Sequence, residues 1–406
     1  MIINQNKIFT NEVKIIFDIF GSDIRLVGGC VRDALLNKKI NDFDFACKLS
    51  PQKIIEKLNQ HKIKNIPTGI KFGTITAVIN HQNFQITTLR ADFDYNGRRC
   101  EVIFTDDFFE DAKRRDFTIN ALYLDENCQL YDFFNGVEDL QNQIVRFVGD
   151  AQNRIQEDYL RIFRFLRFSC EYSNNFDEET LNICLSFKNF LPKISKERTR
   201  EEFIKILNCS RDSNIIKALK IFFDHDIDLD LWGSKLDYKA LEKFLAVKNL
   251  YNSNNFEILK RILVFQLNKI KLDILFENFK STTKEKNLIN KFLKITNEYD
   301  LLNHDNISIN KLLINYSKDL LINIYLIFFA KNSPKLSQKN LENIITYIIN
   351  KEIPLFPIDI LTIKSAGYSD YKLNLAIKFL KNIWAESDFK ILPQQLLREL
   401  KYIKNK

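Results

Sequence analysis

Glycine is distributed unevenly along this chain of 406 residues. Eight of the ten glycines lie at or before Gly149, and only Gly233 and Gly367 follow. Tight turns between short strands depend on glycine, because it adopts positive φ without steric cost. After about Gln152 the pattern changes to long helical periodicities such as "EDYLRIFRFLRFSCEY" and "LENIITYIINKEI". The sequence therefore predicts an α/β head in the first third, followed by an extended helical remainder.

Five short segments of the first third have the composition of β-strands, with many β-branched and aromatic residues. They are "DIRLVGG", "DFDFAC", "FGTITAVI", "FQITTLR" and "CEVIFT". In the helical remainder we expect proline to separate helices, because it lacks the N–H group that a helix interior needs. The prolines concerned are Pro192, Pro334, Pro354, Pro357 and Pro393.

The composition limits which partners and compartments are plausible, but it does not identify them. The formal charge of +8, from 60 Lys and Arg against 52 Asp and Glu, permits a polyanionic partner without requiring one. Seven cysteines form no CxxC spacing, so we expect reduced, mostly packed thiols rather than disulfides or a zinc site. No transmembrane segment or signal-peptide layout is present in the sequence. We therefore expect a cytoplasmic protein without a membrane partner.

The segment "INDFDFAC" sets Asp42 and Asp44 two residues apart in an apolar strand. On a strand this spacing places both side chains on one face. Adjacent carboxylates repel each other unless a cation lies between them, and hard oxygen ligands favour Mg²⁺. A two-metal site of this kind activates an attacking hydroxyl and stabilises the leaving oxygen at phosphorus. The alternative is an exposed edge strand with solvated aspartates.

Directly upstream, "LVGGCVRDALL" is typical of a strand, a Gly-Gly turn and a helix. Gly28 and Gly29 allow backbone N–H groups to approach phosphate oxygens. We expect Arg32, in the first turn of the helix, to hold a triphosphate, and Asp33 to orient Arg32 or the turn. With the DxD strand behind it, this order of elements predicts a site for a nucleoside triphosphate and a metal ion.

The succession "LVGGCVRDALL…DFDFA" resembles the signature of the polymerase-beta-like nucleotidyltransferase superfamily. More narrowly, it is similar to the class II tRNA CCA-adding enzymes and the related bacterial poly(A) polymerases. Further motifs of that family follow in order, over roughly residues 20 to 210: "EDAKRRDFTINALYLD", "YDFFNGVEDLQNQIVRFVGDAQNRIQEDYLRIFRFLRF" and "ISKERTREEFIKIL". The resemblance implies an α+β nucleotidyltransferase head, with a mixed sheet and helices, followed by an all-α neck, body and tail.

The same resemblance suggests domain boundaries and partners. It implies a catalytic head over residues 1–140, a neck with the base-reading motif over 141–210, a body over 211–300 and a tRNA-binding tail over 301–406. The implied substrates are tRNA, CTP and ATP, and the implied cofactor is Mg²⁺.

In "KRRDFTINAL", Arg114, Arg115 and Asp116 form a charged cluster directly before an apolar run. The residue types suit contacts to a triphosphate and a ribose, and the family resemblance implies these contacts for this motif. A capping and salt-bridge cluster at the start of a helix is the alternative. It accounts for Asp116 better than for two adjacent arginines.

In "EDYLRIFRFLRF", Asp158, Arg161, Arg164 and Arg167 recur every three residues, so on a helix they would be neighbours along one ridge. Cytosine and adenine both present an amino donor beside a ring-nitrogen acceptor, whereas uracil and guanine present the reverse. A carboxylate only accepts hydrogen bonds and a guanidinium only donates them. An Asp–Arg pair can therefore bind C and A, and it leaves unsatisfied groups against U and G. The resemblance implies this template role for Asp158 and Arg161, with Arg164 and Arg167 completing the nucleotide pocket. The alternative is a plain i, i+3 salt-bridge ladder.

The motif "SKERTREEF" predicts a helix with Ser195 at its N-cap. Arg198 and Glu202 would then lie within its first turns. They serve either to brace the neck helices or to contact substrate.

Two positions depart from the family pattern. Phe72 stands where many members have His, and Gln85 stands where an acidic residue is usual. If that acid helps to organise the metal ions, Asp42 and Asp44 perform this task alone here, and metal affinity is expected to be lower.

The activity itself has several alternatives. The favoured one is CCA addition to tRNA with CTP and ATP; the others are poly(A) polymerase activity, partial CC or A addition, and an inactive RNA-binding protein. The loop "LRADFDYNGRRCEVIF" favours full CCA addition, because CC-adding relatives shorten it. Its charged residues are Arg90, Asp92, Asp94, Arg98 and Arg99.

Overall fold

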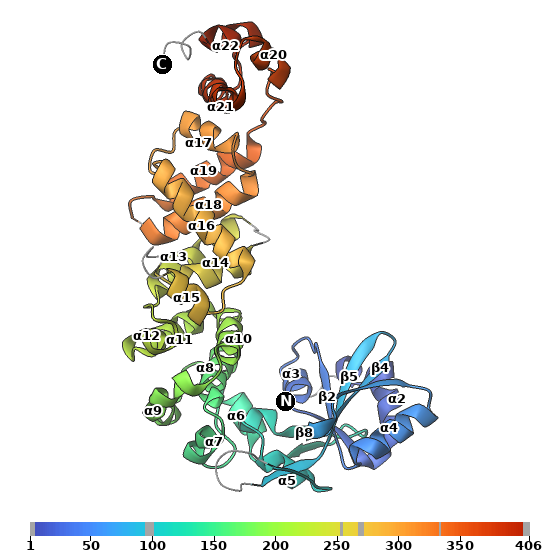
Figure 1. Ribbon diagram of the computed structural model, residues 1–406. Coiled ribbons are helices and arrows are strands. Elements are labelled where there is room, and N and C mark those ends of the chain that lie inside the picture. The colour runs from blue at the N-terminus through green and yellow to red at the C-terminus, as the bar shows by residue number, and fades with distance from the viewer. Residues whose placement is uncertain (1–4, 94–100, 252–254, 267–271, 333, 401–406) are drawn as a thin grey trace. The chain divides into compact units, whose positions relative to one another are not determined.

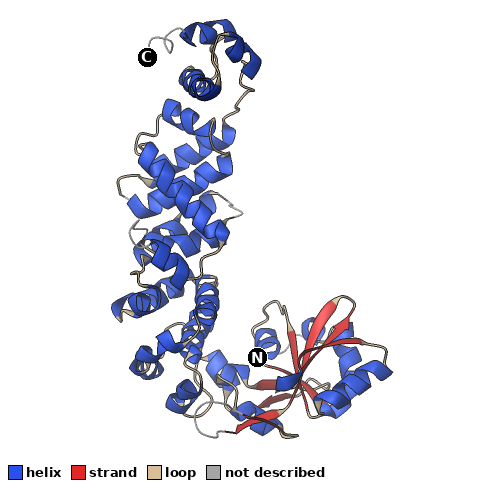
Figure 2. Ribbon diagram, in the orientation of Figure 1, coloured by secondary structure: helices blue, strands red, loops and turns tan. Residues whose placement is uncertain are grey.

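The computed structural model describes residues 5–93, 101–251, 255–266, 272–332 and 334–400 (Figure 1). The chain forms two compact units, Met1–Ala218 and Leu219–Lys406. Every strand of the described residues lies in the first unit, and helices build the second (Figure 2). The predicted α+β head and helical remainder are therefore confirmed, whereas the finer division into head, neck, body and tail stays a prediction.

The strands of the first unit form one large sheet and one small ribbon. They are β1 (Ile24–Val27), β2 (Phe43–Cys47), β3 (Lys64–Gly69), β4 (Thr74–Ile79), β5 (Gln82–Thr88), β6 (Arg90–Phe93), β7 (Glu101–Phe104), β8 (Leu122–Leu124) and β9 (Leu130–Asp132). The sheet has the order β3-β4-β5-β2-β1-β8-β9, and β6 pairs with β7. Only β2 and β5 pair in parallel, and the other neighbours are antiparallel. The sheet is thus mixed, as expected.

All five segments expected to be strands are strands, namely β1, β2, β4, β5 and β7. The sequence did not indicate β3, β6, β8 and β9. Strand β3 contains Pro67 and Gly69, which are unfavourable inside a sheet, and it lies at the edge, where proline is tolerated. Strands β8 and β9 have three residues each, too few to show an alternating pattern.

The two faces of the sheet carry different side chains of β2. Phe45 contacts Phe17 of α2 (Asn11–Phe20), with ring centres 5.7 Å apart. Ala46 belongs instead to a buried cluster with Phe108 and Ala112 of α5 (Phe108–Lys113). Because side chains alternate along a strand, Asp44 shares the face of Ala46. Asp44 therefore lies on the α5 side of the sheet, away from α2.

Helices complete both units. The first contains α1 (Gln5–Ile8), α2, α3 (Gly29–Leu35), α4 (Pro51–Gln60), α5, α6 (Gly136–Gln141), α7 (Ala151–Glu157), α8 (Leu160–Tyr172), α9 (Glu178–Ser186) and α10 (Lys196–Leu207), with α11 (Asp212–Asp224) at the boundary. The second contains α12 (Ile227–Trp232), α13 (Tyr238–Ala246), α14 (Phe256–Leu263), α15 (Leu272–Asn278), α16 (Thr283–Glu298), α17 (Asn306–Leu313), α18 (Lys318–Asn332), α19 (Gln338–Asn350), α20 (Ile360–Ser365), α21 (Asp370–Glu386) and α22 (Pro393–Glu399). No helix among the described residues combines the length and the apolar character needed to cross a membrane.

The prolines and cysteines behave as predicted. Pro334, Pro354 and Pro357 lie between helices, Pro393 begins α22, and Pro192 lies in a 3₁₀ turn. The cysteines of the described residues carry free thiols: Cys30, Cys47, Cys170 and Cys184 are buried, and Cys128 and Cys209 are partly exposed.

Gly136 opens α6 against the backbone of a neighbouring turn. A Cβ atom at this position would lie 2.2 Å from the carbonyl oxygen of Thr118. The Gly136 N–H donates to the Asp132 carboxylate at 2.8 Å, which holds the backbone in this close approach. The position therefore requires glycine for reasons of space.

We predict that Gly136→Ala lowers the free energy of unfolding by about 3 kcal/mol, because the methyl group has no room. Urea-induced unfolding measures the effect. Gly149→Ala is the matched control: Gly149 has φ +74° but nothing within 4 Å of a built Cβ, so only about 1 kcal/mol of conformational cost is expected. Equal losses in both variants would show that the close contact is not the cause.

Candidate active site

Asp42 and Asp44 lie at the start of β2. Asp42 directly precedes the strand, and Asp44 is its second residue. Burial raises the pKa of Asp44, the Arg115 guanidinium lowers it, and the charge of Asp42 raises it again. Since such effects require short distances, the structure brings both Asp42 and Arg115 close to Asp44.

Gln85 lies beside this acidic pair. The parallel pairing of β2 and β5 sets Gln85 in register with Asp44, and β4 places Thr76 on the other side of Gln85. Residues in register point to the same face of a sheet. The position where the family usually has an acid thus adjoins Asp44, and here it carries a neutral, exposed amide. Phe72 is also exposed, in the turn before β4.

The acidic pair suits a hard divalent cation. Within the described residues, no group of three or more His, Cys, Asp and Glu side chains is arranged to hold a metal ion. Two carboxylates are nevertheless sufficient where substrate phosphates and water supply the other ligands. The repulsion between the exposed Asp42 and the partly buried Asp44 is the kind of unfavourable charge that a cation relieves.

The Gly28–Gly29 turn connects β1 to α3 next to these residues. Gly28 has φ +74°, and its N–H donates to the carbonyl of Leu122 at 3.0 Å. A Cβ at Gly28 would lie 3.4 Å from Nη1 of Arg115 and from the carbonyl oxygen of Asn120. Glycine here satisfies the positive φ and leaves the side of the turn that faces Arg115 open.

Asp111 holds both arginines of the "RRD" motif. Its carboxylate accepts from Nε of Arg114 at 2.9 Å and from Nη2 of Arg115 at 3.0 Å, and Tyr123 donates to it at 2.7 Å. Burial alone would raise the pKa of Asp111, but Arg115 and Arg114 outweigh it and lower the pKa to about 2. Asp111 thus fixes the directions of both guanidinium groups.

Asp116 forms a second buried anchor. It accepts from Nδ2 of Asn120 at 3.1 Å and from Nε of Arg164 at 2.8 Å. Arg32 donates in turn to Oδ1 of Asn120. Burial raises the pKa of Asp116, but Arg164 and Asn120 more than compensate, so it lies below its usual value. This chain of bonds joins α3, the "RRD" motif and α8.

The predicted ridge of Asp158, Arg161, Arg164 and Arg167 does not form an i, i+3 salt-bridge ladder, so that alternative is wrong. Helix α8 begins only at Leu160, whose N–H donates to Asp158 at 3.1 Å. The four residues pair with others: Asp158 with Arg198, Arg161 with Glu157, Arg164 with Asp116 and Arg167 with Glu202. Asp158 nevertheless contributes to the raised pKa of Arg164, so the two lie near each other.

Helix α10 packs against α8 and contacts its Arg167, which agrees with the expected bracing role of its residues. Ser195 is its N-cap and accepts from the N–H of Arg198 at 3.4 Å. Glu202, almost fully buried, accepts from Nε of Arg167 at 2.7 Å and from Lys205 at 2.9 Å.

Several residues of the site were not singled out in the sequence, above all Asp111, Asn120 and Glu157. Asp111 precedes Arg114 and Arg115 by three and four residues, which is the spacing of ion pairs on a helix. The sequence alone could therefore have indicated these two pairs. The loop expected to support the change of nucleotide lies partly outside the residues that the structure describes. Asp94, Arg98, Arg99 and the side chain of Asp92 lie outside the described residues.

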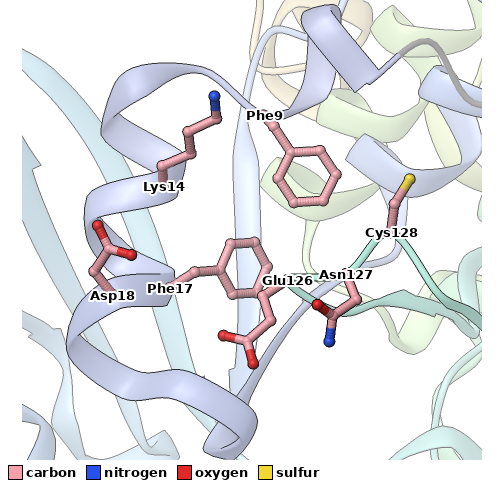
Figure 3. Close-up of a pocket in the computed structure, with 7 residues that line it drawn as sticks. All are labelled: Phe9, Lys14, Phe17, Asp18, Glu126, Asn127 and Cys128. Atoms are coloured by element: carbon pink, nitrogen blue, oxygen red, sulfur yellow. The ribbon is translucent and has the colours of Figure 1, made fainter.

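A pocket of about 430 Å³ lies elsewhere on the first unit (Figure 3). Figure 3 shows Phe17 projecting from α2 toward the turn that carries Glu126 and Asn127, and Lys14 and Asp18 of the same helix also line the pocket. Because Phe17 packs on the face of β2 opposite Asp44, this pocket is separate from the acidic pair.

Two protein-family models match the chain. The model of the poly A polymerase head domain matches residues 24–146. The model described as a probable RNA and SrmB-binding site of polymerase A matches residues 175–221.

Curated relatives align with between about half and nearly all of the chain. A mouse protein, CCA tRNA nucleotidyltransferase 1, mitochondrial, is 32% identical over 405 residues, which span 97% of this chain and 91% of the mouse protein. Its human counterpart is 38% identical over 69% of this chain and 65% of its own length. The CCA-adding enzyme of Enterococcus faecalis is 42% identical over 46% of each chain. For the latter two, the alignment spans less than two thirds of the relative.

Solved structures share the fold along nearly the whole chain. The Bacillus stearothermophilus CCA-adding enzyme in complex with CTP has a TM-score of 0.73 at 22% identity, covering 98% of this chain and 100% of that one. The Thermotoga maritima CCA-adding enzyme complexed with tRNA has a TM-score of 0.71 at 17% identity, with coverage of 98% and 97%.

We predict that Asp111→Asn destabilises the protein at neutral pH by about 3 kcal/mol, because two arginines lose their buried counter-charge. The folded-state pKa of Asp111, about 2, lies below the ordinary aspartate value of 3.8. The carboxylate therefore contributes about 2 kcal/mol above pH 4, and this contribution is lost as the pH falls toward 2. Urea unfolding at successive pH values should show the difference between wild type and variant shrinking in that window.

Glu110→Gln, on the same helix, is the control. Its exposed ion pair with Lys113 predicts a change below about 1 kcal/mol at neutral pH. A difference between wild type and Asp111→Asn that stays constant down to pH 2 would contradict the assigned role of Asp111.

Proposed function

Because this chain belongs to the family of CCA-adding tRNA nucleotidyltransferases, we propose that it adds CCA to the 3′ end of tRNA without a template, using CTP and ATP. The tRNA 3′-hydroxyl attacks the α-phosphorus in line, and pyrophosphate leaves. The observation that carries the proposal is the convergence of Asp42 and Asp44 with Arg115 beside the Gly28–Gly29 turn.

Asp42 and Asp44 are the proposed catalytic residues and metal ligands. Nucleotidyltransferases depend in general on divalent metal ions, and Mg²⁺ is the one proposed here. Bound Mg²⁺ supplies stabilisation of the negative charge that develops at the transferring phosphorus. The protein's own part is to position the reactants and to compensate charge, which is the main source of acceleration in phosphoryl transfer.

The nucleotide is proposed to lie between the turn and the "RRD" motif. The Gly28–Gly29 turn, with Arg32 and Arg115, faces the triphosphate, while Arg114 and Asp116 serve the ribose side. The buried carboxylate of Asp111 supports this arrangement, since it holds both guanidinium groups before substrate arrives.

Asp158 and Arg161 are proposed to read the base, with Arg164 and Arg167 completing the pocket. An acceptor beside a donor matches both cytosine and adenine and leaves unsatisfied groups against uracil and guanine. The proximity of Asp158 to Arg164 supports a common pocket.

The protein is proposed to act in the cytoplasm, and its helical tail over residues 301–406 to bind tRNA. The free thiols of the described cysteines suit a reducing compartment. Two of the relatives carry the word mitochondrial in their names, so localisation of a tagged full-length chain is the direct test.

The activity is tested by gel-resolved extension with Mg²⁺ on tRNA lacking CCA, tRNA ending in CC and an unstructured RNA. Three added nucleotides on the first, one on the second and little on the third are expected. Asp44→Asn should reduce the rate at least about a thousandfold, because one of two metal ligands is lost. Long ATP-dependent tails on all three RNAs would identify a poly(A) polymerase, and full activity in the variant would refute the catalytic role of Asp44.

A second prediction concerns Gln85. Gln85→Glu adds a third carboxylate beside Asp44, so we expect a several-fold lower Mg²⁺ concentration for half-maximal activity. Without metal, the extra repulsion should lower the melting temperature, and Mg²⁺ should restore it. Gln52→Glu on α4, an exposed position on another element, is the control for the same chemical change. An unchanged Mg²⁺ dependence of both activity and melting would contradict the predicted influence of Gln85.

A further inference from the structure

The last residue of α8, Tyr172, lies against Arg32 of α3. The Arg32 guanidinium carbon is 4.2 Å from the centre of the Tyr172 ring. The Tyr172 hydroxyl donates to Oδ1 of Asp33 at 3.1 Å, and Nε of Arg32 donates to the same oxygen at 3.0 Å. Tyr172 therefore contacts both members of the Arg32–Asp33 pair.

These contacts leave one direction for Arg32. Nε is held by Asp33, Nη1 by Asn120, and the flat face of the guanidinium by Tyr172. Nη2 lies 3.6 Å from the place where a Cβ on Gly29 would be, so it faces the Gly-Gly turn. The Arg32 side chain is 8% exposed, and a guanidinium fixed on three sides is oriented before any ligand arrives.

The chemistry of Tyr172 suits this role. Burial raises its pKa, so the hydroxyl remains protonated and acts as the donor to Asp33. Lys38 also approaches the ring, at 4.6 Å, and pairs with Glu171 at 2.7 Å. The ring thus contacts two cations, which its negative face attracts.

We propose that Tyr172 is a positioning residue for the triphosphate, acting through Arg32. This inference rests on the proposed function, in which Arg32 faces the nucleotide phosphates. Helix α8 then serves both ends of the nucleotide: its first turn carries Arg161 for the base, and its last residue orients Arg32 for the phosphates. The effect of Tyr172 should consequently be the same for every base.

The test measures dissociation constants of inorganic tripolyphosphate, CTP and ATP by calorimetry, with the full chain at fixed Mg²⁺. Tyr172→Leu removes the ring and should raise the dissociation constants of all three ligands by a similar factor of about ten. Tyr172→Phe keeps the ring and lacks only the hydroxyl, so the loss of affinity in this variant should stay below about threefold. Tyr347→Phe is the control, because it removes a comparable hydroxyl bond, 2.8 Å to Asn310, in the second unit; no change is expected.

Two results would overturn the inference. Unchanged binding in Tyr172→Leu would show that Arg32 does not depend on the ring. A loss for CTP and ATP with unchanged tripolyphosphate binding would show that Tyr172 acts on the base instead. Circular dichroism confirms that each variant is folded at the assay temperature, and Tyr172→Phe keeps the comparison available if Tyr172→Leu does not fold. The binding measurement contains no RNA, so it does not depend on CCA addition. An inactive enzyme and an Arg32 that does not depend on Tyr172 are therefore distinguished.

Discussion

The arginines of the nucleotide site depend on buried carboxylates for their positions. Asp111 holds Arg114 and Arg115, and Asp116 holds Arg164, each through direct hydrogen bonds. Removing one partner from such a pair commonly costs about 3–5 kcal/mol, because the other charge stays buried and uncompensated. The cluster is therefore stable without substrate, and its guanidinium groups need little reorganisation when phosphates arrive. The remaining pairs are Arg161 with Glu157, Arg167 with Glu202 and Asp158 with Arg198.

The sheet supplies the second constraint, because its register decides which groups share a face. Parallel pairing of β2 and β5 sets Asp44 beside Gln85, and a shift of one residue would turn Asp44 toward α2. The Gly28 turn then brings α3 against Arg115. Metal ligands, turn and arginines thus lie together because of strand pairing, although they are far apart in the sequence.

The parts predicted well were those with a local cause. The strand that carries Asp44 follows from its apolar and aromatic residues, and the N-cap at Ser195 follows from residue type. The ion-pair partners of the arginines were not predicted, because several of them are not local: Arg164 reaches Asp116, 48 residues away, and Arg198 reaches Asp158 over 40. The i, i+3 and i, i+4 spacings within one helix cannot predict such distant partners. They could have predicted the pairs of Asp111 with Arg114 and Arg115.

The partners of Asp158 and Arg161 bear on how a base is selected without a template. Asp158 pairs with Arg198, and the two side chains are 35% and 52% exposed, so this pair is weak and easily exchanged. Arg161 is bound to Glu157 in the same way, with less exposure. If both residues read the base as proposed, a nucleotide must replace these internal partners. Cytosine and adenine offer a donor to the carboxylate and an acceptor to the guanidinium, which compensates the exchange. Uracil and guanine offer the reverse, so the internal pairs persist, and selection arises from competition with the protein's own ion pairs.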